Sequence, residues 1–428
     1  MLYDCWRGIA RAYSGNLALY DVGRKRTWTF GELLSLAEAG SNSVEPIIYP
    51  QGGQAEFVIS VLQAWRSNKI VCPLEMGQGR PEIVTPLPSR LVHLKLTSAT
   101  TGKPRLVAFT ASQLMADCDN IVQTMGLRAD WPNLAVISLA HSYGFSNLIL
   151  PLLLHGIPLI LVGSGLPEAL RQAAESRDAV TLAAVPALWQ TWHEAGAIPR
   201  NVRLAISAGA PLPLTLEKAV LDARDLKLHN FYGSSECGGI AYDGSDEVRA
   251  DSSCVGTPLH NVKVQTADDG CVEIHSAAVG ETYWPEAGPE LASGVFRTSD
   301  VGQLKNGAVY LSGRSTDQIN VAGRKVLPET IEAVLSAHPQ VRACLAFGVP
   351  SVDNQRGETI VACVVGKGAV PGESLRQFAL AHLAAWQVPR EWWFVETLEV
   401  NGRGKLSRAE WRKRYLESGR MSSPLKVK

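Results

Sequence analysis

Residues 97–105 read TSATTGKPR, a run of hydroxyl side chains that ends in glycine, lysine, proline and arginine. The run follows residues 91–96 (LVHLKL), whose apolar alternation is typical of a strand. Backbone N–H groups, hydroxyls and cations are the groups that hold phosphate oxygens in proteins. This loop therefore predicts a nucleotide phosphate site formed by Thr97, Ser98, Thr100, Thr101, Gly102 and Lys103.

The same loop is not a Walker A motif. Thr97 stands where that motif has its first glycine, and Pro104 follows the lysine where it has serine or threonine. A P-loop nucleoside triphosphatase is therefore excluded. Taken alone, the run also fits an ordinary turn, because Ser, Thr, Gly and Pro clusters commonly separate elements.

Composition and charge narrow the class of protein. The chain has 428 residues, which predicts two or three domains. Its 41 basic and 41 acidic residues balance, so we expect no partnership with nucleic acid. The eight cysteines show neither CxxC nor metal-ligand spacing, which predicts a reduced, cytoplasmic protein.

No segment predicts secretion or membrane insertion. The N-terminus, MLYDCWRGIA, lacks a cationic region followed by an apolar core, so we expect no signal peptide. The longest apolar run, residues 148–162, is too short and too interrupted for a membrane span. It predicts a buried helix, a turn at His155-Gly156 and a buried strand.

Hydrophobic patterning predicts an α/β fold. Short buried strands at 134–139, 159–162, 180–185 and 202–207, several of them separated by helical stretches, indicate layered, mostly parallel sheets. From about Val255 short strands and turns indicate a β-rich subdomain, with a hairpin turn at residues 268–270.

The last 110 or so residues predict a separate small α+β unit. Pro328 begins a helix, a position where proline is tolerated. Ser407 has capping-box spacing to Glu410 and begins the final helix. Between them we expect strands at 343–349, 359–365 and 392–396 and a helix at 375–386.

Four further motifs carry candidate chemistry. In residues 231–236 (FYGSSE) an aromatic ring suits a nucleobase and Glu236 suits Mg²⁺ beside phosphates. Residues 207–211 (SAGAP) follow a buried strand, where ligands of α/β sheets bind. Asp300 ends FRTSD and suits the hydroxyls of a ribose, and Lys405 lies in NGRGK. Each motif alone also fits a strand end, a cap or a solvated charge.

Together and in this order, the motifs resemble one family. TSATTGKPRL resembles the phosphate loop TSGTTGxPKG, Tyr232–Glu236 resembles YGxTE, and Phe296–Asp300 resembles YRTGD. Ser207–Leu212 resembles SGGAPL, residues 313–332 resemble GRxxDxIxxxGxxxxPxEIE, and residues 404–408 resemble GKxxR. From about Trp28 to Arg408 the chain is similar to the acyl-adenylate-forming superfamily, which contains acyl- and aryl-CoA ligases, adenylation domains of peptide synthetases and firefly-type luciferases.

The resemblance implies roles for particular residues. Lys405, Glu236, Arg314 and His141 would be catalytic, with Glu236 as the metal ligand. Besides the loop, the nucleotide would be bound by Gly209, Ala210, Pro211, Tyr232, Gly233, Ser235, Asp300 and Arg314. The acid pocket would be lined by His141, Tyr143, Ser146, Gly209, Cys237 and Gly238. A buried structural role for His141 is an equally good interpretation. No acidic residue is apparent in this pocket, which argues against an amino-acid substrate.

The implied reaction has two steps. A carboxylic acid, aromatic or fatty, reacts with ATP and Mg²⁺ to give an acyl-adenylate and pyrophosphate, and the acyl group then passes to the thiol of CoA. Residues 1–313 would form the adenylation domain, and residues 314–428 a mobile domain that carries Lys405 and turns about a hinge near Thr316. Transfer to the phosphopantetheine thiol of an acyl carrier protein and a non-catalytic adenylate-binding protein remain alternatives. Retention of Lys405, Glu236, Asp300 and Arg314 argues against the last.

Several positions depart from the family pattern. Ala99 and Ser299 replace glycines, Arg105 replaces a lysine, and Thr316 replaces the usual acid or lysine at the hinge. Thr27 to Thr97 is also shorter than is common in the family, so we expect elements of the first subdomain to be missing.

Overall fold

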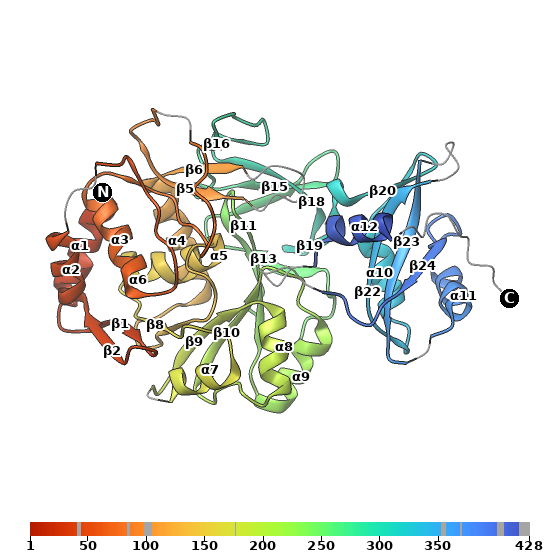
Figure 1. The fold of residues 1–428 in the computed structure, drawn as a ribbon, viewed down its shortest axis with the longest axis horizontal. Helices are drawn as coiled ribbons and strands as arrows, with labels where there is room; N and C mark the ends of the chain where they lie inside the picture. The colour runs from red at the N-terminus through yellow and green to blue at the C-terminus, as the bar shows by residue number, and fades with distance from the viewer. Residues whose placement is uncertain are drawn as a thin grey trace.

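The computed structural model describes residues 1–428 except 41–43, 84–85, 98–104, 176, 352–356, 369, 400–405 and 419–428. A large N-terminal part and a small C-terminal part lie beside each other along the long axis of the molecule (Figure 1). Within the described residues, no helix combines the length and the apolar character needed to cross a bilayer.

One large sheet runs through the N-terminal part, with 14 strands among the described residues. Its spatial order is β14 (Lys263–Thr266), β15 (Cys271–His275), β18 (Val295–Lys305), β19 (Ala308–Arg314), β13 (Cys254–Pro258), β12 (Gly238–Tyr242), β11 (Leu228–Ser234), β10 (Val202–Ala208), β9 (Val180–Ala184), β7 (Asn133–Ala135), β8 (Leu159–Leu161), β1 (Leu17–Asp21) and β2 (Arg26–Thr29), with β17 (Leu291–Ala292) beside β18.

This sheet changes character at β11. From β1 through β8, β7, β9 and β10 to β11 the neighbouring strands are parallel. From β11 through β12, β13 and β19 to β18, β15 and β14 they are antiparallel. The predicted fold class, a parallel α/β part followed by a β-rich part, is therefore confirmed.

The strand predicted at 134–139 is wrong in length, because β7 ends at Ala135. The chain instead turns back on itself over residues 136–141. A Cβ built on Gly144 would lie only 1.9 Å from the Ser138 carbonyl oxygen, so glycine permits this close approach. The turn places His141 directly before helix α5 (Ser142–Gly144).

A second sheet carries the phosphate loop. Its order is β16 (Thr282–Trp284), β6 (Leu106–Thr110), β5 (Leu91–Leu96), β4 (Ile70–Val71) and β3 (Ile47–Ile48). Strands β5 and β6 are antiparallel, and Leu96 pairs with Leu106 on either side of the loop.

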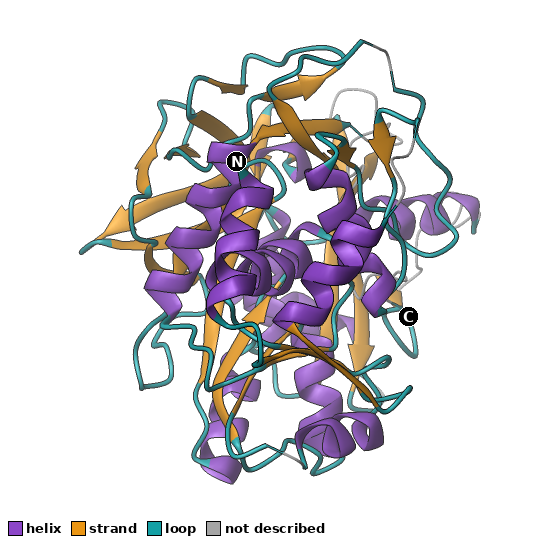
Figure 2. Cartoon of the chain, turned by 90° about the vertical axis from the view of Figure 1, so that its left-hand side faces the viewer, coloured by secondary structure: helices purple, strands orange, loops and turns teal. Residues whose placement is uncertain are grey.

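Helices cover the sheets (Figure 2). Those of the N-terminal part are α1 (Leu2–Ala12), α2 (Phe30–Ala39), α3 (Ala55–Arg66), α4 (Ala111–Met125), α5, the π-helix η1 (Phe145–Ile149), α6 (Leu150–His155), α7 (Pro167–Ala174), α8 (Pro186–Glu194) and α9 (Leu214–Arg224). Residues 148–162 form the predicted helix, left-handed Gly156 and strand β8.

The C-terminal part has a core of its own, built from Ile319, Ile331, Leu335, Ala362, Leu375 and neighbouring apolar residues. Its elements are the 3-10 turn η2 (Ser315–Asp317), β20 (Ile319–Val321), β21 (Arg324–Val326), α10 (Pro328–Ser336), β22 (Val341–Pro350), β23 (Glu358–Gly366), α11 (Gly372–His382), β24 (Glu391–Phe394) and α12 (Arg408–Glu417). The Ser407 hydroxyl caps α12 by accepting a hydrogen bond from the Glu410 N–H. The domain boundary after residue 313 stays a prediction.

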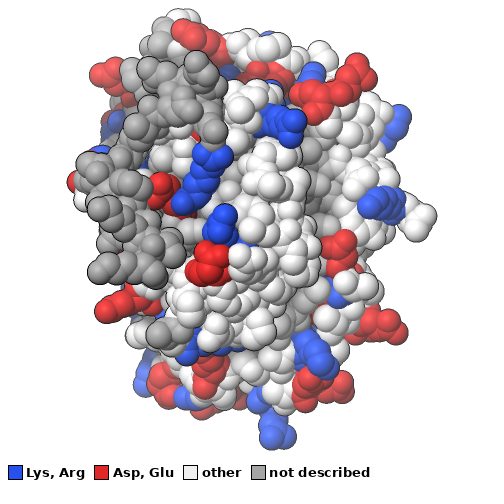
Figure 3. Space-filling model, turned by 90° about the vertical axis from the view of Figure 1, so that its right-hand side faces the viewer, with Lys and Arg blue, Asp and Glu red and all other residues white. Residues whose placement is uncertain are grey.

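Figure 3 shows the face that this part presents at its free end. Basic and acidic side chains are interspersed on the described surface of this face, among many uncharged residues.

A buried charge network lies where β11 begins and β12 ends, in the middle of the large sheet. The Glu217 carboxylate of α9 is fully buried and accepts from Lys227 at 2.7 Å and from the Arg249 Nε at 2.9 Å. Lys227 also donates to Asp243, and Arg249 donates to the Leu212 carbonyl at 2.8 Å. Because Leu212 ends the predicted adenine segment, the network holds that segment against the sheet.

Replacing Glu217 with alanine should destabilise the fold by about 3–5 kcal/mol, because two buried cations lose their shared anion. Lys218→Ala is the matched control on the same helix, since Lys218 forms an exposed pair with Asp222 at 3.0 Å. This control should cost less than about 1 kcal/mol. Denaturant unfolding measures the free energy of unfolding of both variants. Similar small losses in the two variants would show that the network does not stabilise the fold.

Candidate active site

The predicted adenine and YGSSE segments leave the same edge of the large sheet. Strands β10 and β11 are parallel, with Ala208 opposite Phe231, so their carboxyl ends are adjacent. Gly209 follows β10 at φ 86°, a left-handed conformation that favours glycine. The structure therefore brings Gly209, Ala210 and Pro211 close to Tyr232, Gly233 and Ser235.

Asp300 lies between two partners from different parts of the chain. Its Oδ2 accepts from the Tyr232 hydroxyl at 2.5 Å, and its Oδ1 accepts from the Arg314 Nε at 2.9 Å. Pairing of β18 with β19 places Asp300 directly opposite Arg314. Three of the predicted nucleotide-binding residues thus form one hydrogen-bonded group.

Burial and charge shift the pKa values in this group. Burial raises the pKa of the Tyr232 hydroxyl well above its usual value, and the neighbouring Asp300 carboxylate raises it further. Burial disfavours the Arg314 cation, but the charge and hydrogen bond of Asp300 outweigh this effect, so its pKa is raised. Tyr232 therefore stays a hydrogen-bond donor and Arg314 stays a cation at neutral pH.

Glu236 is connected to the end of the phosphate loop. Its Oε1 accepts from the Tyr283 hydroxyl at 3.2 Å, and its backbone carbonyl accepts from the Gly280 N–H at 2.8 Å. The Arg105 guanidinium stacks 3.5 Å from the Tyr283 ring centre and pairs with Glu290 at 2.7 Å. Tyr283 thus links the predicted metal ligand to the last residue of the loop.

The base of the phosphate loop is closed by Thr97 and Arg105. The Thr97 N–H donates to the Arg105 carbonyl at 2.8 Å, and the Arg105 N–H donates to the Thr97 hydroxyl at 3.1 Å. The other predicted phosphate ligands lie outside the described residues: Ser98, Thr100, Thr101, Gly102 and Lys103. Lys405 also lies outside them, so its place relative to Glu236 stays a prediction.

The segment around His141 reaches the same region. The His141 Nδ1 accepts from the Tyr143 N–H at 3.2 Å, which caps the short helix α5. Ser142 and Ser235 join their hydroxyls at 2.9 Å, so this segment contacts the YGSSE motif. The cap gives His141 a structural role, although the residue is only partly buried, and the serine contact places its segment beside the YGSSE motif.

Two of the predicted acid-pocket residues, Ser146 and Gly238, contact buried charged side chains that the motifs did not identify. The Ser146 hydroxyl donates to Asp117 at 2.6 Å, and the Gly239 N–H donates to Asp117 at 3.0 Å. A Cβ at Gly238 would lie 1.9 Å from an Asp117 oxygen, so glycine is required for this contact. Lys95 donates to Ser146 at 3.3 Å. An acidic residue, Asp117, therefore does lie beside the predicted acid pocket, although both of its carboxylate oxygens accept hydrogen bonds from the protein.

Two neighbours complete the group. Tyr143 lies against Phe231, with ring centres 5.9 Å apart. Burial raises the pKa of the Cys237 thiol well above its usual value. Cys237 is therefore a thiol at neutral pH and contributes shape to the site, because the thiolate is the nucleophilic form of cysteine.

Sequence motifs missed Lys95, Asp117 and Tyr283. One signal was present for Lys95, since a cation in an otherwise apolar strand must find a buried partner or be solvated. Asp117 and Tyr283 carry no such signal, because their roles come from contacts between segments that are 122 and 47 residues apart.

Thr316 is exposed in the turn η2, directly after Arg314 and Ser315. The next residue, Asp317, accepts from Arg408 at 3.0 Å, and Arg408 also pairs with Glu332 at 2.7 Å. The hinge segment is thus joined to the residue that ends the GKLSR motif. The role of Thr316 as a hinge stays a prediction.

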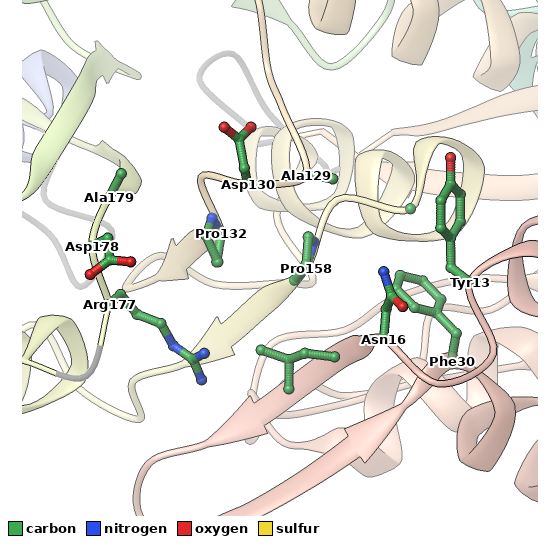
Figure 4. Close-up of a pocket in the computed structure, with 12 residues that line it drawn as sticks. Tyr13, Asn16, Phe30, Ala129, Asp130, Pro132, Pro158, Arg177, Asp178 and Ala179 are labelled. Carbon is green, nitrogen blue, oxygen red and sulfur yellow. The ribbon is translucent and has the colours of Figure 1, made fainter.

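A cavity of about 400 Å³ lies apart from this site. Figure 4 shows it between Tyr13, Asn16 and Phe30 on one side and Arg177 and Asp178 on the other. None of the predicted site residues lines it. It therefore carries no part of the predicted chemistry.

Family models match most of the chain. Residues 51–296 match the AMP-binding enzyme model, and residues 330–405 match the model of the AMP-binding enzyme C-terminal domain. The chain belongs to the AMP-binding enzyme family. The predicted family and the prediction that this protein is an enzyme are confirmed.

Named relatives of this AMP-binding enzyme are acid–CoA ligases. A probable 2-succinylbenzoate–CoA ligase of Mycobacterium tuberculosis is 30% identical over 335 residues, which cover 74% of this chain and 83% of the relative. A feruloyl-CoA synthase of Amycolatopsis is 28% identical over 345 residues, which cover 75% of this chain and 69% of the relative. The predicted class, an acid–thiol ligase, is confirmed at this level.

Solved structures share the fold. The ATP-bound MatB of Rhodopseudomonas palustris superposes with a TM-score of 0.82 at 19% identity, over 95% of this chain and 98% of that one. The amide bond synthetase McbA of Marinactinospora thermotolerans superposes with a TM-score of 0.82 at 23% identity, over 97% of this chain and 100% of that one. These likenesses confirm the architecture of the AMP-binding enzyme.

Asp300→Ala should raise the KM for ATP about tenfold or more, because removing a hydrogen-bonding charge costs about 1.5–3 kcal/mol. Asp269→Ala is the matched control, since Asp269 pairs with Arg297 at 2.6 Å on the same sheet but is half exposed. Initial rates at varied ATP concentration measure both variants. An unchanged KM in Asp300→Ala would remove Asp300 from the nucleotide site.

Proposed function

We propose that this enzyme uses ATP to convert a carboxylic acid to an acyl-adenylate with release of pyrophosphate, and then transfers the acyl group to the thiol of CoA. One observation carries the proposal: the Tyr232–Asp300–Arg314 group and Glu236 meet at one sheet edge, beside the base of the phosphate loop. The named CoA ligases among the relatives support the same reaction.

In the first step a carboxylate oxygen bonds to the α-phosphorus of ATP, and the bond from that phosphorus to pyrophosphate breaks. Both reactants are anions, so electrostatic repulsion opposes their approach. Cations and N–H groups aimed at the developing charge offset this repulsion. Asp300 would accept the ribose hydroxyls, Gly209–Pro211 and Tyr232 would hold the adenine, and the 97–105 loop and Lys405 would contact the phosphates.

Glu236 fits a magnesium site. Tyr283 occupies one oxygen of its carboxylate, and no group of three or more metal-ligating side chains occurs in the part of the chain that the structure describes. Mg²⁺ is commonly held by one or two carboxylates together with substrate phosphates. When bound, the ion would neutralise charge on the phosphates.

In the second step the thiol sulfur bonds to the acyl carbon, the carbon–oxygen bond to AMP breaks, and the thiol proton passes to solvent. Residues 314–428 would turn about Thr316 beforehand, which withdraws Lys405 and brings a different face to the site. Closure of this part would also protect the mixed anhydride from water.

The acid is proposed to be aromatic or fatty, and the protein cytoplasmic. Transfer to the phosphopantetheine thiol of a carrier protein is the second candidate for the acceptor, since no contact in the described residues is specific to CoA. The fold likeness to an amide bond synthetase makes an amine a useful third acceptor to test.

Pyrophosphate release from MgATP should be measured across benzoates, cinnamates and fatty acids. CoA, a phosphopantetheine-loaded carrier protein and a simple amine should each be added in separate reactions. Release with one acid class, accelerated by CoA, is the expected result. Release that is accelerated only by the carrier protein or only by the amine would identify that compound as the acceptor in place of CoA. No pyrophosphate release with any of the acids would contradict the proposed reaction.

Tyr283→Phe should raise the Mg²⁺ concentration needed for half-maximal pyrophosphate release about tenfold, since groups that orient a metal ligand commonly contribute 10–100-fold. Tyr49→Phe is the control, because Tyr49 also lies beneath an arginine, Arg80, at 4.8 Å but far from Glu236. Mn²⁺ binding followed by electron paramagnetic resonance in the presence of ATP gives a readout independent of turnover. Equal Mg²⁺ and Mn²⁺ dependence in wild type and Tyr283→Phe would rule out this role.

Lys405→Ala should slow acyl-adenylate formation by roughly 10²-fold or more, because it removes a cation that offsets charge in the transition state. Thioester formation from a supplied acyl-adenylate should change far less. Lys413→Ala, which removes an exposed pair with Glu417 at 3.7 Å, should leave both half-reactions unchanged. Equal losses in both half-reactions of Lys405→Ala would contradict the rotation of the C-terminal part.

A further inference from the structure

A buried polar cluster lies behind the residues that follow Glu236. It consists of Lys95 on β5, Asp117 on α4 and Ser146 in η1, each at most 4% exposed. The Ser146 hydroxyl donates to Asp117 at 2.6 Å and accepts from the Lys95 ammonium at 3.3 Å. The shortest distance between Lys95 and Asp117 themselves is 3.9 Å. Lys95 and Asp117 therefore interact mainly through the serine.

Contacts place this cluster against the proposed acid site. Asp117 accepts from the Gly239 N–H and touches the backbone of Gly238. Burial lowers the pKa of the Lys95 ammonium, and the carboxylates of Asp117 and Glu236 oppose this shift. Ser146, Cys237 and Gly238 are themselves predicted to line the acid pocket. The cluster therefore lies directly behind residues that are predicted to line the acid pocket.

The cluster has more hydrogen-bond donors than acceptors. An ammonium group has three N–H donors, and Lys95 uses one on Ser146. Its distance of 3.9 Å from Asp117 is too long for a hydrogen bond. The Phe109 ring, 4.6 Å from the ammonium nitrogen, offers only a cation–π contact. Both Asp117 oxygens already accept bonds.

His93 adds one unpaired donor and one unpaired acceptor, because burial lowers its pKa and keeps the ring neutral. It precedes Lys95 by two residues on β5, so both side chains project from the same face of the strand. The ring is fully buried, and neither nitrogen has a hydrogen-bond partner among the described residues. Phe145 lies against it, with ring centres 4.4 Å apart. Buried donors without partners cost free energy, and a ligand that accepts their hydrogen bonds offsets that cost.

A purely structural ion pair accounts less well for these distances. Lys227, the other buried lysine among the described residues of the N-terminal part, approaches two carboxylates at 2.7 and 2.6 Å. Such short contacts are what a buried charge needs if the protein alone is to compensate it. Lys95 has no comparable contact among the described residues.

We propose that Lys95, with His93 behind it, selects acids whose far end carries an oxygen acceptor: a carbonyl, a hydroxyl or a second carboxylate. The inference rests on the proposed function, because it places the acid beside Cys237 and Gly238. It narrows that function from aromatic or fatty acids in general to those with an oxygen at the end opposite the reacting carboxylate.

The test compares acids of matched shape in acid-dependent ATP–pyrophosphate exchange. 4-Hydroxybenzoate and terephthalate are compared with 4-methylbenzoate, and 6-oxoheptanoate and adipate with heptanoate. Wild type should prefer the oxygen-bearing acid by about tenfold or more in kcat/KM in at least one series. Preference for terephthalate or adipate would identify a second carboxylate as the group that Lys95 recognises. Preference for 4-hydroxybenzoate or 6-oxoheptanoate would identify a neutral oxygen.

Lys95→Met keeps the length of the side chain and removes its donors. It should abolish the preference while keeping exchange with 4-methylbenzoate or heptanoate. Lys305→Met is the matched control, because Lys305 also lies over an aromatic ring, Tyr310, at 5.5 Å, but on the distant strand β18. This control should keep the preference.

Either a wild type without preference or a Lys95→Met variant that retains it would overturn the inference. The wild-type result alone is decisive if Lys95→Met does not fold. Thermal shifts with each acid in the absence of turnover separate the two proposals. Acid binding with the stated preference but no exchange would refute acyl-adenylate formation and leave the selectivity of Lys95 intact, whereas neither binding nor exchange would refute both.

Discussion

The contact of Asp300 with Tyr232 and Arg314 joins the parallel and antiparallel halves of the large sheet beside the predicted domain boundary. Tyr232 lies in β11, the last parallel strand, Asp300 lies in β18 of the antiparallel half, and Arg314 ends β19 at the predicted domain boundary. A partly buried carboxylate such as that of Asp300 is stabilised by charged or hydrogen-bonding partners. Both partners are residues that the proposed nucleotide site also needs, so the same contact stabilises the fold and shapes the site.

A second constraint is the repulsion between the two reacting anions. The proposed mechanism offsets this repulsion with groups predicted in separate segments: the phosphate loop between β5 and β6, the YGSSE motif at the end of β11, and the GRGK segment before α12. Tyr283 links two of these segments, because it contacts both Glu236 and Arg105. The described contacts therefore connect the base of the predicted phosphate loop to Glu236, the predicted metal ligand, through Tyr283.

Local chemistry made much of the fold predictable. Proline at position 328, the Asp268-Asp269-Gly270 turn and the apolar runs that form β9 and β10 each act over a few residues, and the structure has the expected element at each. The strand predicted at 134–139 failed because a backbone approach between Ser138 and Gly144 overrides the apolar pattern. Residues that act through distant contacts, such as Asp117 and Tyr283, have no local signature. The motifs predicted the Tyr232–Asp300–Arg314 group residue by residue, but its hydrogen bonds needed the register between β18 and β19.

The most direct test of the account is an isotope-transfer experiment with the acid that supports the fastest pyrophosphate release. The acid carries ¹⁸O in both carboxylate oxygens and reacts with MgATP and the best acceptor. Mass spectrometry then measures the ¹⁸O content of the AMP and the phosphate that are formed. Attack of the carboxylate on the α-phosphorus predicts one ¹⁸O atom in AMP and none in phosphate. Unlabelled AMP, or label in inorganic phosphate, would contradict an acyl-adenylate intermediate.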